Sequence, residues 1–392
     1  MTPARSQVRP SLLRQLHSRQ VLTTLQQQGP MSRAEIARHT GISGPTVTRA
    51  VSDLLAAGLL EEGDALPAAA GRPGKIIRLA SLRVGVLGVV VGVRGCELVA
   101  AGLDGQIQPD SVRTFPTPPR YADLVAAIAA HAQPFLNNGG ATILGMGVSM
   151  PGLLNRRHER TVFSPNLHQA DGQCLGVDLR ERLGLDVAMI QESHALCLAE
   201  QTYGAARGVA DFAMLDLTDG LGLGVVLGGR QMEGHSGLAG ELGHITVELN
   251  GRPCGCGNRG CLETVATDSA LATALSERLG HTLTIDDIVT AVRAGRLRAD
   301  EEFERLLQYL AVGLAAVVNI FNPSKLFLYA RFLDAAPDLW DRLMTLTHQR
   351  ALAPSLADCA IIRARGNKQL GAIACIIHRF TTDRTDFTRG ER

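Results

Sequence analysis

The clearest chemical signal in the sequence is a cluster of cysteines in a glycine-rich stretch. Cys254, Cys256 and Cys261 lie within eight residues in the run Cys-Gly-Cys-Gly-Asn-Arg-Gly-Cys, and His244 lies ten residues upstream. Three thiolates and one imidazole make a closed set of four ligands, which is typical of structural zinc. Glycines let the backbone fold tightly around an ion. The spacing therefore predicts a structural Zn2+ site, in preference to a group of unrelated thiols.

The other cysteines and the N-terminus bear on the compartment. The basic N-terminus lacks an apolar core before a cleavage site, so we expect no secretion signal. The sequence contains no run of 18 uncharged apolar residues, so it predicts no membrane span. We therefore expect a cytoplasmic protein with no membrane contact, whose scattered cysteines are reduced, buried side chains. These are Cys96, Cys174, Cys197, Cys359 and Cys375.

Charge is distributed unevenly along the 392 residues, a length that accommodates two or three domains. Residues 1–80 hold 10 Lys and Arg against 5 Asp and Glu, whereas the rest holds 29 against 33. A basic small module beside a mildly acidic large one suits nucleic-acid contact at one end. An excess of positive charge of this size also arises by chance, so the charge distribution by itself does not establish nucleic-acid binding.

Three helical patterns follow one another in the basic N-terminal module. The first covers 11–28 and is stopped by a Gly-Pro pair. A capping box that begins at Ser32 predicts the second helix, and Gly41 makes the turn after it. Ser43 can cap a third helix, with Pro45 near its start, where a missing N–H costs nothing.

The third helix and the segment after it present the groups expected at a DNA contact. Opposite its apolar face the helix shows Pro45, Thr46 and Arg49, a small polar surface with one cation that suits the major groove. A strand, a Gly-Arg-Pro-Gly-Lys tip containing Arg72 and Lys75, and a returning strand predict a β-hairpin wing. This order predicts a winged helix-turn-helix that binds DNA, in preference to a helical domain for protein contacts.

From residue 81 to 392 buried strands alternate with amphipathic helices. This alternation predicts an α/β architecture in two lobes, and we find no short internal repeat. Strands are expected at 86–92, 97–103, 143–150, 187–190, 212–217, 222–227 and 326–329. Helices are expected at 121–136, 178–183, 193–203, 268–279, 285–294, 301–320 and after Gly366. We therefore divide the chain into a DNA-binding domain, 1–80, and a body, 81–392.

Several motifs together resemble a known family. The run Gly240-Glu-Leu-Gly-His244 followed by CGCGNRGCLE is similar to the signature of the ROK family of repressors, unannotated reading frames and sugar kinases. The stretch MSRAEIARHTGISGPTVTRAVSDLLAAGLL and the Gly-Arg-Pro wing resemble the DNA-binding half of ROK repressors, and MGVSMPGLLN, SPNL, YGAARG and LTDGLGLGVVLGGR resemble the ROK body. The resemblance implies a winged helix-turn-helix followed by a two-lobed, actin-like or hexokinase-like domain around a sugar cleft.

The resemblance also assigns residues. It places the family's zinc ligands on His244 and the three clustered cysteines, and its sugar-contacting groups on Glu241, His244 and Glu263. Asn166, in SPNL, is a further candidate. Carboxylates and imidazole can hydrogen-bond several hydroxyls. The alternative for Glu241 and Glu263 is a solvated or zinc-supporting role.

The sequence departs from ROK kinases at the catalytic pair. Kinases of the family carry Asn-Asp where Gln191 and Glu192 stand, and that Asp deprotonates the sugar hydroxyl. The extra methylene of Glu moves the carboxylate by about 1 Å, which can cost ~10²-fold in rate. Both residues remain candidates for the sugar site.

The nucleotide-binding segments depart further. Where ROK kinases have Asp-x-Gly-Gly-Thr, this chain has Val90-Val-Gly-Val-Arg94, and Asp219 replaces the Thr of Gly-Thr-Gly. The glycine turn on the adenosine side reads Ala330-Arg331. A carboxylate aimed at a polyphosphate is repulsive unless a metal intervenes. We therefore expect no ATP binding, no phosphoryl transfer and no enzyme activity.

These observations predict a DNA-binding transcriptional regulator. We expect it to repress carbohydrate-utilisation genes under the control of a sugar bound in a kinase-like cleft. Its expected partners are a pseudo-palindromic double-stranded operator, a small sugar effector and further copies of itself in a homodimer or homotetramer. Two alternatives stay open: an active ATP-dependent sugar kinase with a DNA-binding module, and a regulator controlled by a protein partner.

Overall fold

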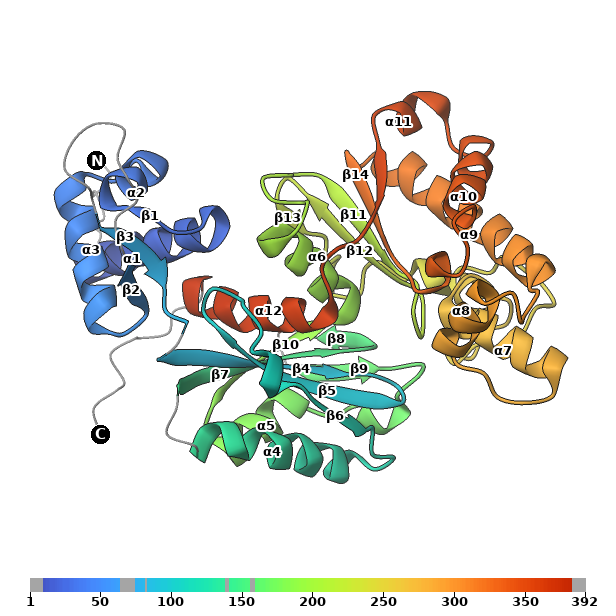
Figure 1. Ribbon diagram of the computed structural model, residues 1–392, viewed down its shortest axis with the longest axis horizontal. Helices are drawn as coiled ribbons and strands as arrows, with labels where there is room; N and C mark the ends of the chain where they lie inside the picture. The colour runs from blue at the N-terminus through green and yellow to red at the C-terminus, as the bar shows by residue number, and fades with distance from the viewer. Residues whose placement is uncertain (1–9, 64–74, 82, 138–140, 156–158, 383–392) are drawn as a thin grey trace, which may run out of the picture.

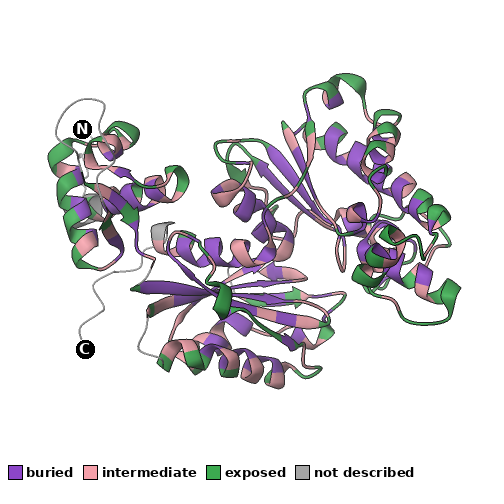
Figure 2. Ribbon diagram, in the orientation of Figure 1, coloured by how far each residue is buried: buried purple, intermediate pink, exposed green. Residues whose placement is uncertain are grey.

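The computed structural model describes residues 10–63, 75–81, 83–137, 141–155 and 159–382. Figure 1 shows a small N-terminal module at one end, followed by two larger lobes that each contain a twisted sheet. Buried residues concentrate on the central strands of these sheets and on the helices that cover them (Figure 2). The α/β fold and the two lobes expected from the sequence are both present.

The N-terminal module is a winged helix-turn-helix. It consists of α1 (Pro10–Gln28), β1 (Met31–Ser32), α2 (Arg33–Thr40), α3 (Gly44–Ala56), β2 (Leu60–Gly63) and β3 (Ile76–Leu79). Its strands form a sheet in the order β1-β3-β2, with β2 and β3 antiparallel. These two strands are the expected sides of the wing, and the tip at 64–74 lies outside the described residues.

Both helix starts were predicted, but only one has the expected cap. The Ser32 hydroxyl accepts from Glu35 N at 3.3 Å, and the Glu35 carboxylate accepts from Ser32 N at 2.8 Å, which confirms the capping box. Ser43 occupies the cap position of α3 but makes no side-chain cap bond. Its hydroxyl lies 2.8 Å from Thr46 Oγ1 instead, because the two side chains face each other across the first turn.

The first lobe is built on a five-stranded mixed sheet with strand order β10-β7-β4-β5-β6. The strands are β4 (Val84–Val91), β5 (Gly95–Gly102), β6 (Arg113–Pro116), β7 (Thr142–Met150) and β10 (Asp186–Gln191). One face is covered by α4 (Tyr121–Asn137) and α5 (Leu175–Leu183), and the other by α12 (Lys368–Thr382) (Figure 1). A short hairpin, β8 (Leu153–Asn155) with β9 (Arg160–Phe163), adjoins this lobe.

The second lobe repeats the topology of the first. Its sheet has the order β13-β12-β11-β14-β15, made by β11 (Phe212–Asp216), β12 (Gly222–Leu227), β13 (Arg230–Gln231), β14 (Lys325–Tyr329) and β15 (Ala360–Arg363). In both sheets the first strand is central, the next two are antiparallel on one side, and the last two are parallel on the other. This duplication is the actin-like arrangement that the sequence predicted.

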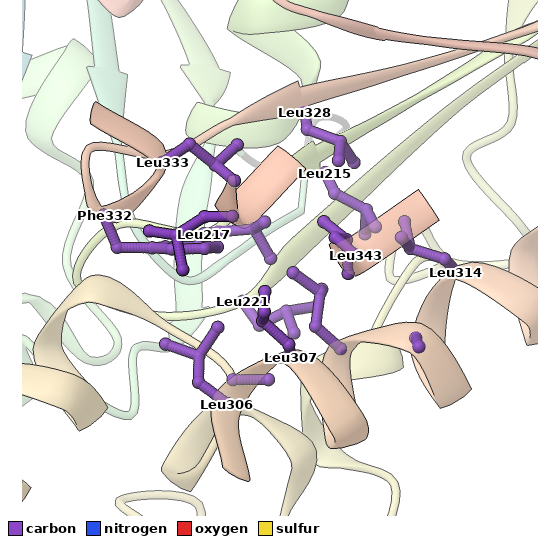
Figure 3. Packing of buried hydrophobic residues seen from close by; sticks show 14 of the residues in the cluster. Leu215, Leu217, Leu221, Leu306, Leu307, Leu314, Leu328, Phe332, Leu333 and Leu343 are labelled. Atoms are coloured by element: carbon purple, nitrogen blue, oxygen red, sulfur yellow. The ribbon is translucent and has the colours of Figure 1, made fainter. Parts of the chain in front are cut away.

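Helices of the second lobe pack on its sheet around a leucine-rich core. They are α7 (Asp268–Leu279), α8 (Ile285–Arg293), α9 (Asp300–Phe321), α10 (Leu339–His348) and α11 (Ala353–Ala357). Figure 3 shows Leu215 and Leu328 of the sheet packed against Leu314 of α9 and Leu343 of α10. Among the described helices α9 alone has the length and apolar composition to cross a bilayer, and more than half of its apolar window is buried in this core.

Two helices fill the space between the sheets. α12 lies on the first sheet, and α6 (Glu192–Tyr203) packs on α12 and on strands β11 and β12 of the second. Glycine permits this close packing, because a Cβ on Gly147 of β7 would lie 1.8 Å from the Ala372 carbonyl oxygen. α6 and α12 also contact α1, and Leu22 of α1 shares a hydrophobic cluster with Ile376 of α12. The DNA-binding module is therefore packed onto the first lobe.

Candidate functional site

The predicted zinc ligands converge. One ligand atom from each of His244, Cys254, Cys256 and Cys261 lies within 4.8 Å of every other. The sulfurs of Cys256 and Cys261 are 3.7 Å apart, and the Cys254 sulfur is 3.6 Å from His244 Nδ1. Zn–S bonds of about 2.3 Å in a tetrahedron place two sulfurs about 3.8 Å apart. The four side chains therefore fit a tetrahedral zinc ion.

Backbone turns place these ligands. His244 ends a short 3-10 helix, Leu242–His244, and the cysteines lie in a tight loop in which Cys254 N donates to the Asn258 carbonyl at 2.8 Å. Gly260 has a φ of 66°, and a Cβ there would lie 1.7 Å from the Glu248 carbonyl oxygen. Glycine is required at that position by both its conformation and its close neighbour.

A cleft of about 210 Å³ opens beside the metal-ligand cluster, between the two lobes. The first lobe contributes residues around Gly152 and Phe163, and the second contributes 219–222 and the zinc-site segment. All six residues that the sequence assigned to sugar binding line this cleft. They are Asn166, Gln191, Glu192, Glu241, His244 and Glu263. Their shared position is compatible with the predicted sugar site.

Two carboxylates connect the cleft with the metal-ligand cluster. Glu263 Oε1 lies 3.6 Å from His244 Nδ1 and 2.9 Å from the Cys254 sulfur, and Glu241 Oε2 lies 3.7 Å from His244 Nε2. Gln191 Nε2 donates to Glu241 Oε1 at 3.5 Å and so links the lobes. Each of these two side chains reaches both the cleft and the metal-ligand cluster. Sugar contact and support of the zinc site are therefore both compatible with their positions.

The structure adds a residue that the sequence analysis missed. Lys368, at the start of α12, is 8% exposed, and its Nζ lies 2.7 Å from Glu192 Oε1 and 2.8 Å from Asp216 Oδ2. It also donates to Thr218 Oγ1 at 3.1 Å. Glu192 begins α6 and Asp216 ends β11, so one ammonium group joins three elements at the edge of the cleft. A lone Lys in a helical pattern gave no sequence signal for this contact.

Burial controls the charges of this group. Burial, together with the neighbouring Asp216 carboxylate, raises the pKa of Glu192 to about 7 against the opposing charge of Lys368. Burial alone would lower the pKa of Lys368, but the two carboxylates outweigh it and raise that pKa. The lysine therefore stays protonated at neutral pH, while Glu192 is close to its own titration point.

The segment that replaces the first phosphate loop is occupied by an ion pair. Arg94 lies in the turn between β4 and β5, and its Nη2 is 3.2 Å from Asp219 Oδ1 of the second lobe. Asp219 replaces the Thr of the second phosphate loop, and the sequence analysis treated the two positions separately. The structure brings them together, so each neutralises the other across the lobes.

The adenosine-side turn is also filled by protein groups. The Asp268 carboxylate accepts from Arg331 N at 2.9 Å and from Phe332 N at 2.7 Å. The Arg331 guanidinium bonds to Asp286 and Asp334, each at 2.9 Å. Burial raises the pKa of Asp268 to about 7, and the two backbone donors oppose that shift. These two backbone amides are therefore already bonded to a carboxyl group of the protein.

The predicted DNA-contacting residues lie on two surfaces of the module. Pro45 and Arg49 are exposed at the start of α3, and Thr46 is half-buried beside them. Lys75 lies at the base of the wing, where its ammonium pairs with Glu62 of the facing strand. Arg72 lies outside the described residues.

Comparison with known protein families gives a separate match for each of the two parts of this architecture. A winged helix-turn-helix DNA-binding model matches residues 15–61, and the ROK family model matches residues 86–377. The class is thus a DNA-binding module joined to a sugar-kinase-like body. The chain belongs to the ROK family.

Individual relatives include both regulators and kinases. The xylose repressor of Bacillus subtilis (strain 168) is 26% identical over 331 residues, which cover 83% of this chain and 85% of that protein. A crystal structure of a ROK family transcriptional regulator, described as a homologue of the E. coli MLC protein, matches with a TM-score of 0.78 and 25% identity over 94% of this chain and 96% of its own. The ROK hexokinase from Thermus thermophilus gives a TM-score of 0.60 and 28% identity, over 75% of this chain and 99% of its own.

Proposed function

We propose that this protein is a sugar-responsive transcriptional repressor that binds a double-stranded operator in the cytoplasm. The observation that carries the proposal is the combination, in one chain, of an exposed recognition-helix surface and an interlobe cleft lined by hydroxyl-binding groups. Similarity to the xylose repressor over 83% of this chain supports it. The regulated genes are those of carbohydrate utilisation.

The DNA contact is made by the start of α3 and by the wing. Pro45, Thr46 and Arg49 enter the major groove, and Arg72 and Lys75 reach phosphates or the adjacent minor groove. One recognition helix reads few base pairs, so two copies related by two-fold symmetry bind a pseudo-palindromic site. The assembly is a homodimer or a homotetramer.

The sugar is held without being phosphorylated. Asn166, Gln191, Glu192, Glu241 and Glu263 supply donors and acceptors for its hydroxyls, and His244 borders the same space. The phosphate-loop positions support a body without kinase chemistry, because Asp219 is paired with Arg94 and the backbone amides of the adenosine-side turn are bonded to a carboxylate.

The metal site has a structural role in this proposal. His244, Cys254, Cys256 and Cys261 hold one Zn2+ with no open position. The ion supplies rigidity to the loop, and Glu241 and Glu263 are thereby fixed at the edge of the cleft.

The DNA-binding half is tested with DNA selected by the full-length protein from a random-sequence pool. We expect a two-fold symmetric consensus, and we expect Arg49→Ala to weaken binding by about 1–3 kcal/mol. Arg230→Ala, which removes an exposed Arg in the second lobe, is the matched control and should bind like the parent. Unchanged operator affinity in Arg49→Ala would contradict the recognition-helix assignment.

The kinase alternative is tested by a coupled ATP-consumption assay with a panel of hexoses and pentoses. We expect no sugar-dependent turnover in the parent. Glu192→Asp, which restores the shorter carboxylate, should remain inactive because the nucleotide segments are still occupied. Ordinary turnover with any sugar would establish the alternative instead.

A further inference from the structure

The cleft described above carries a marked charge imbalance. Five of the described residues that line it carry carboxylates. No lysine or arginine is among the described residues of this lining. The carboxylates are Glu192, Asp216, Asp219, Glu241 and Glu263. The imidazole of His244 is the remaining titratable nitrogen on this lining, and it belongs to the metal-ligand cluster.

The cations nearest the cleft are already engaged. Lys368 is bonded to both Glu192 and Asp216, so two carboxylates share one ammonium group. Arg94 is paired with Asp219 across the lobes. Glu241 and Glu263 have no lysine or arginine partner among the described contacts. An anionic ligand would therefore enter a cleft whose positive charges are spent on its own acidic groups.

The start of α6 also faces this cleft, and a helix N-terminus ordinarily favours an anion. Here that position is taken by the protein itself, because Glu192 is the first residue of α6 and its carboxylate lies beside Lys368. Burial is the main cause that raises the pKa of Glu192, so this desolvated position disfavours a negative charge.

A ligand that carries hydroxyl groups is favoured by the acidic lining that disfavours an anion. Carboxylates accept hydrogen bonds from hydroxyls. Sugar hydroxyls can therefore donate to the carboxylates of this lining.

We propose that the effector is an unphosphorylated sugar, and that the acidic lining of the cleft excludes the corresponding sugar phosphates. This inference rests on the proposed function, since it concerns the ligand of the same site. It divides the possible effectors by chemistry, because a transported sugar and its phosphorylated product differ in two negative charges at neutral pH.

The test measures binding to the full-length protein by thermal shift and calorimetry, using matched pairs. The pairs are glucose with glucose 6-phosphate, xylose with xylose 5-phosphate, and N-acetylglucosamine with its 6-phosphate. We expect one or more of the unphosphorylated sugars to bind, and each bound sugar to bind at least tenfold more tightly than its phosphate, which corresponds to about 1.4 kcal/mol.

A variant tests whether the carboxylates cause the discrimination. Asp219→Asn removes one negative charge and frees Arg94, so we expect the preference for the unphosphorylated member to fall at least threefold. Asp286→Asn is the matched control, because Asp286 is also paired with an arginine but is exposed and lies outside the cleft lining. It should keep the full preference.

The failures are distinguishable. A sugar phosphate that binds as tightly as its parent sugar, or more tightly, overturns this inference and leaves the proposed function standing. Full discrimination in Asp219→Asn overturns the assignment to that carboxylate. No binding by any sugar or sugar phosphate overturns the proposed sugar response and this inference with it.

Discussion

At the scale of single residues, the metal-ligand cluster consists of residue types whose chemistry the sequence shows directly. Cys256 is half-buried and Cys261 is buried, and their sulfurs approach to 3.7 Å. Such closeness is unfavourable for two thiolates without a cation between them, and a metal ion removes that repulsion.

We expect Cys256→Ser to lose its zinc and to unfold at a temperature about 2–4 °C lower, which corresponds to about 2–3 kcal/mol for a chain of this size. Metal analysis and thermal unfolding of natively purified protein give the measurement. Cys174→Ser is the control, because Cys174 is half-buried and lies outside the cluster. Full zinc occupancy in Cys256→Ser would contradict the assigned ligand set.

Glu192 makes a second residue-scale prediction, which concerns pH. Its pKa is raised from 4.5 to about 7, so the native protein binds a proton that the unfolded chain releases between these values. The contribution of this residue to the free energy of unfolding therefore falls as pH rises through this window. Glu192→Gln lacks the effect and still leaves Lys368 paired with Asp216.

Denaturant unfolding at pH 5, 6, 7 and 8 tests this prediction. The free energy of unfolding of Glu192→Gln, relative to the parent, should rise by on the order of 2 kcal/mol across that range. A difference that stays constant with pH would show that Glu192 keeps an ordinary pKa in the folded protein.

At the scale of elements, α6 and α12 connect the cleft with the DNA-binding module. Both begin at the Glu192–Lys368 ion pair, and both contact α1. They are also tightly seated, since a Cβ on Gly371 would lie 2.2 Å from the Ala195 carbonyl oxygen. A ligand that moves the start of either helix therefore moves a rigid body that touches α1.

Sequence patterns predicted most of the helices and strands. They did not predict how these elements pack against one another. The start of α6 follows from a buried strand that runs into an amphipathic segment. In contrast, α10 was missed although Leu339, Leu343 and Thr347 repeat at helical spacing along it. Lys368 was missed because its partners lie about 150 and 176 positions away, and only the fold brings them together.

The packing of α1 gives the element-scale prediction. Leu22→Ala should open a cavity in the cluster shared by α1 and α12 and should lower the free energy of unfolding by about 2–5 kcal/mol. We expect this variant to bind its operator but to need at least threefold more sugar for release. Leu343→Ala, in the core of the second lobe, is the control. It should lose similar stability and keep the sugar response of the parent, as measured by operator-binding titrations.

At the scale of the whole molecule, the proposed sugar and operator sites lie on different parts of one chain. The cleft lies between the lobes, whereas the start of α3 lies on the exposed surface of the N-terminal module (Figure 1). We expect a sugar in the cleft to favour one arrangement of the lobes, and that arrangement to set the spacing of the two recognition helices in the proposed dimer. If operator DNA accepts one spacing, both ligands bias the same equilibrium.

This coupling must be reciprocal. If the sugar weakens operator binding tenfold, the operator weakens sugar binding tenfold, which is about 1.4 kcal/mol in each direction. Titrating the sugar identified by the matched pairs into free protein and into the protein–operator complex measures both factors. We expect release of DNA by the sugar. Glu241→Ala should abolish the response and leave operator affinity without sugar unchanged, because Glu241 lines the cleft and not the DNA-binding module. A Glu241→Ala protein that responds like the parent would place the effector site elsewhere, and a factor of one in both directions would show that sugar and operator are not coupled.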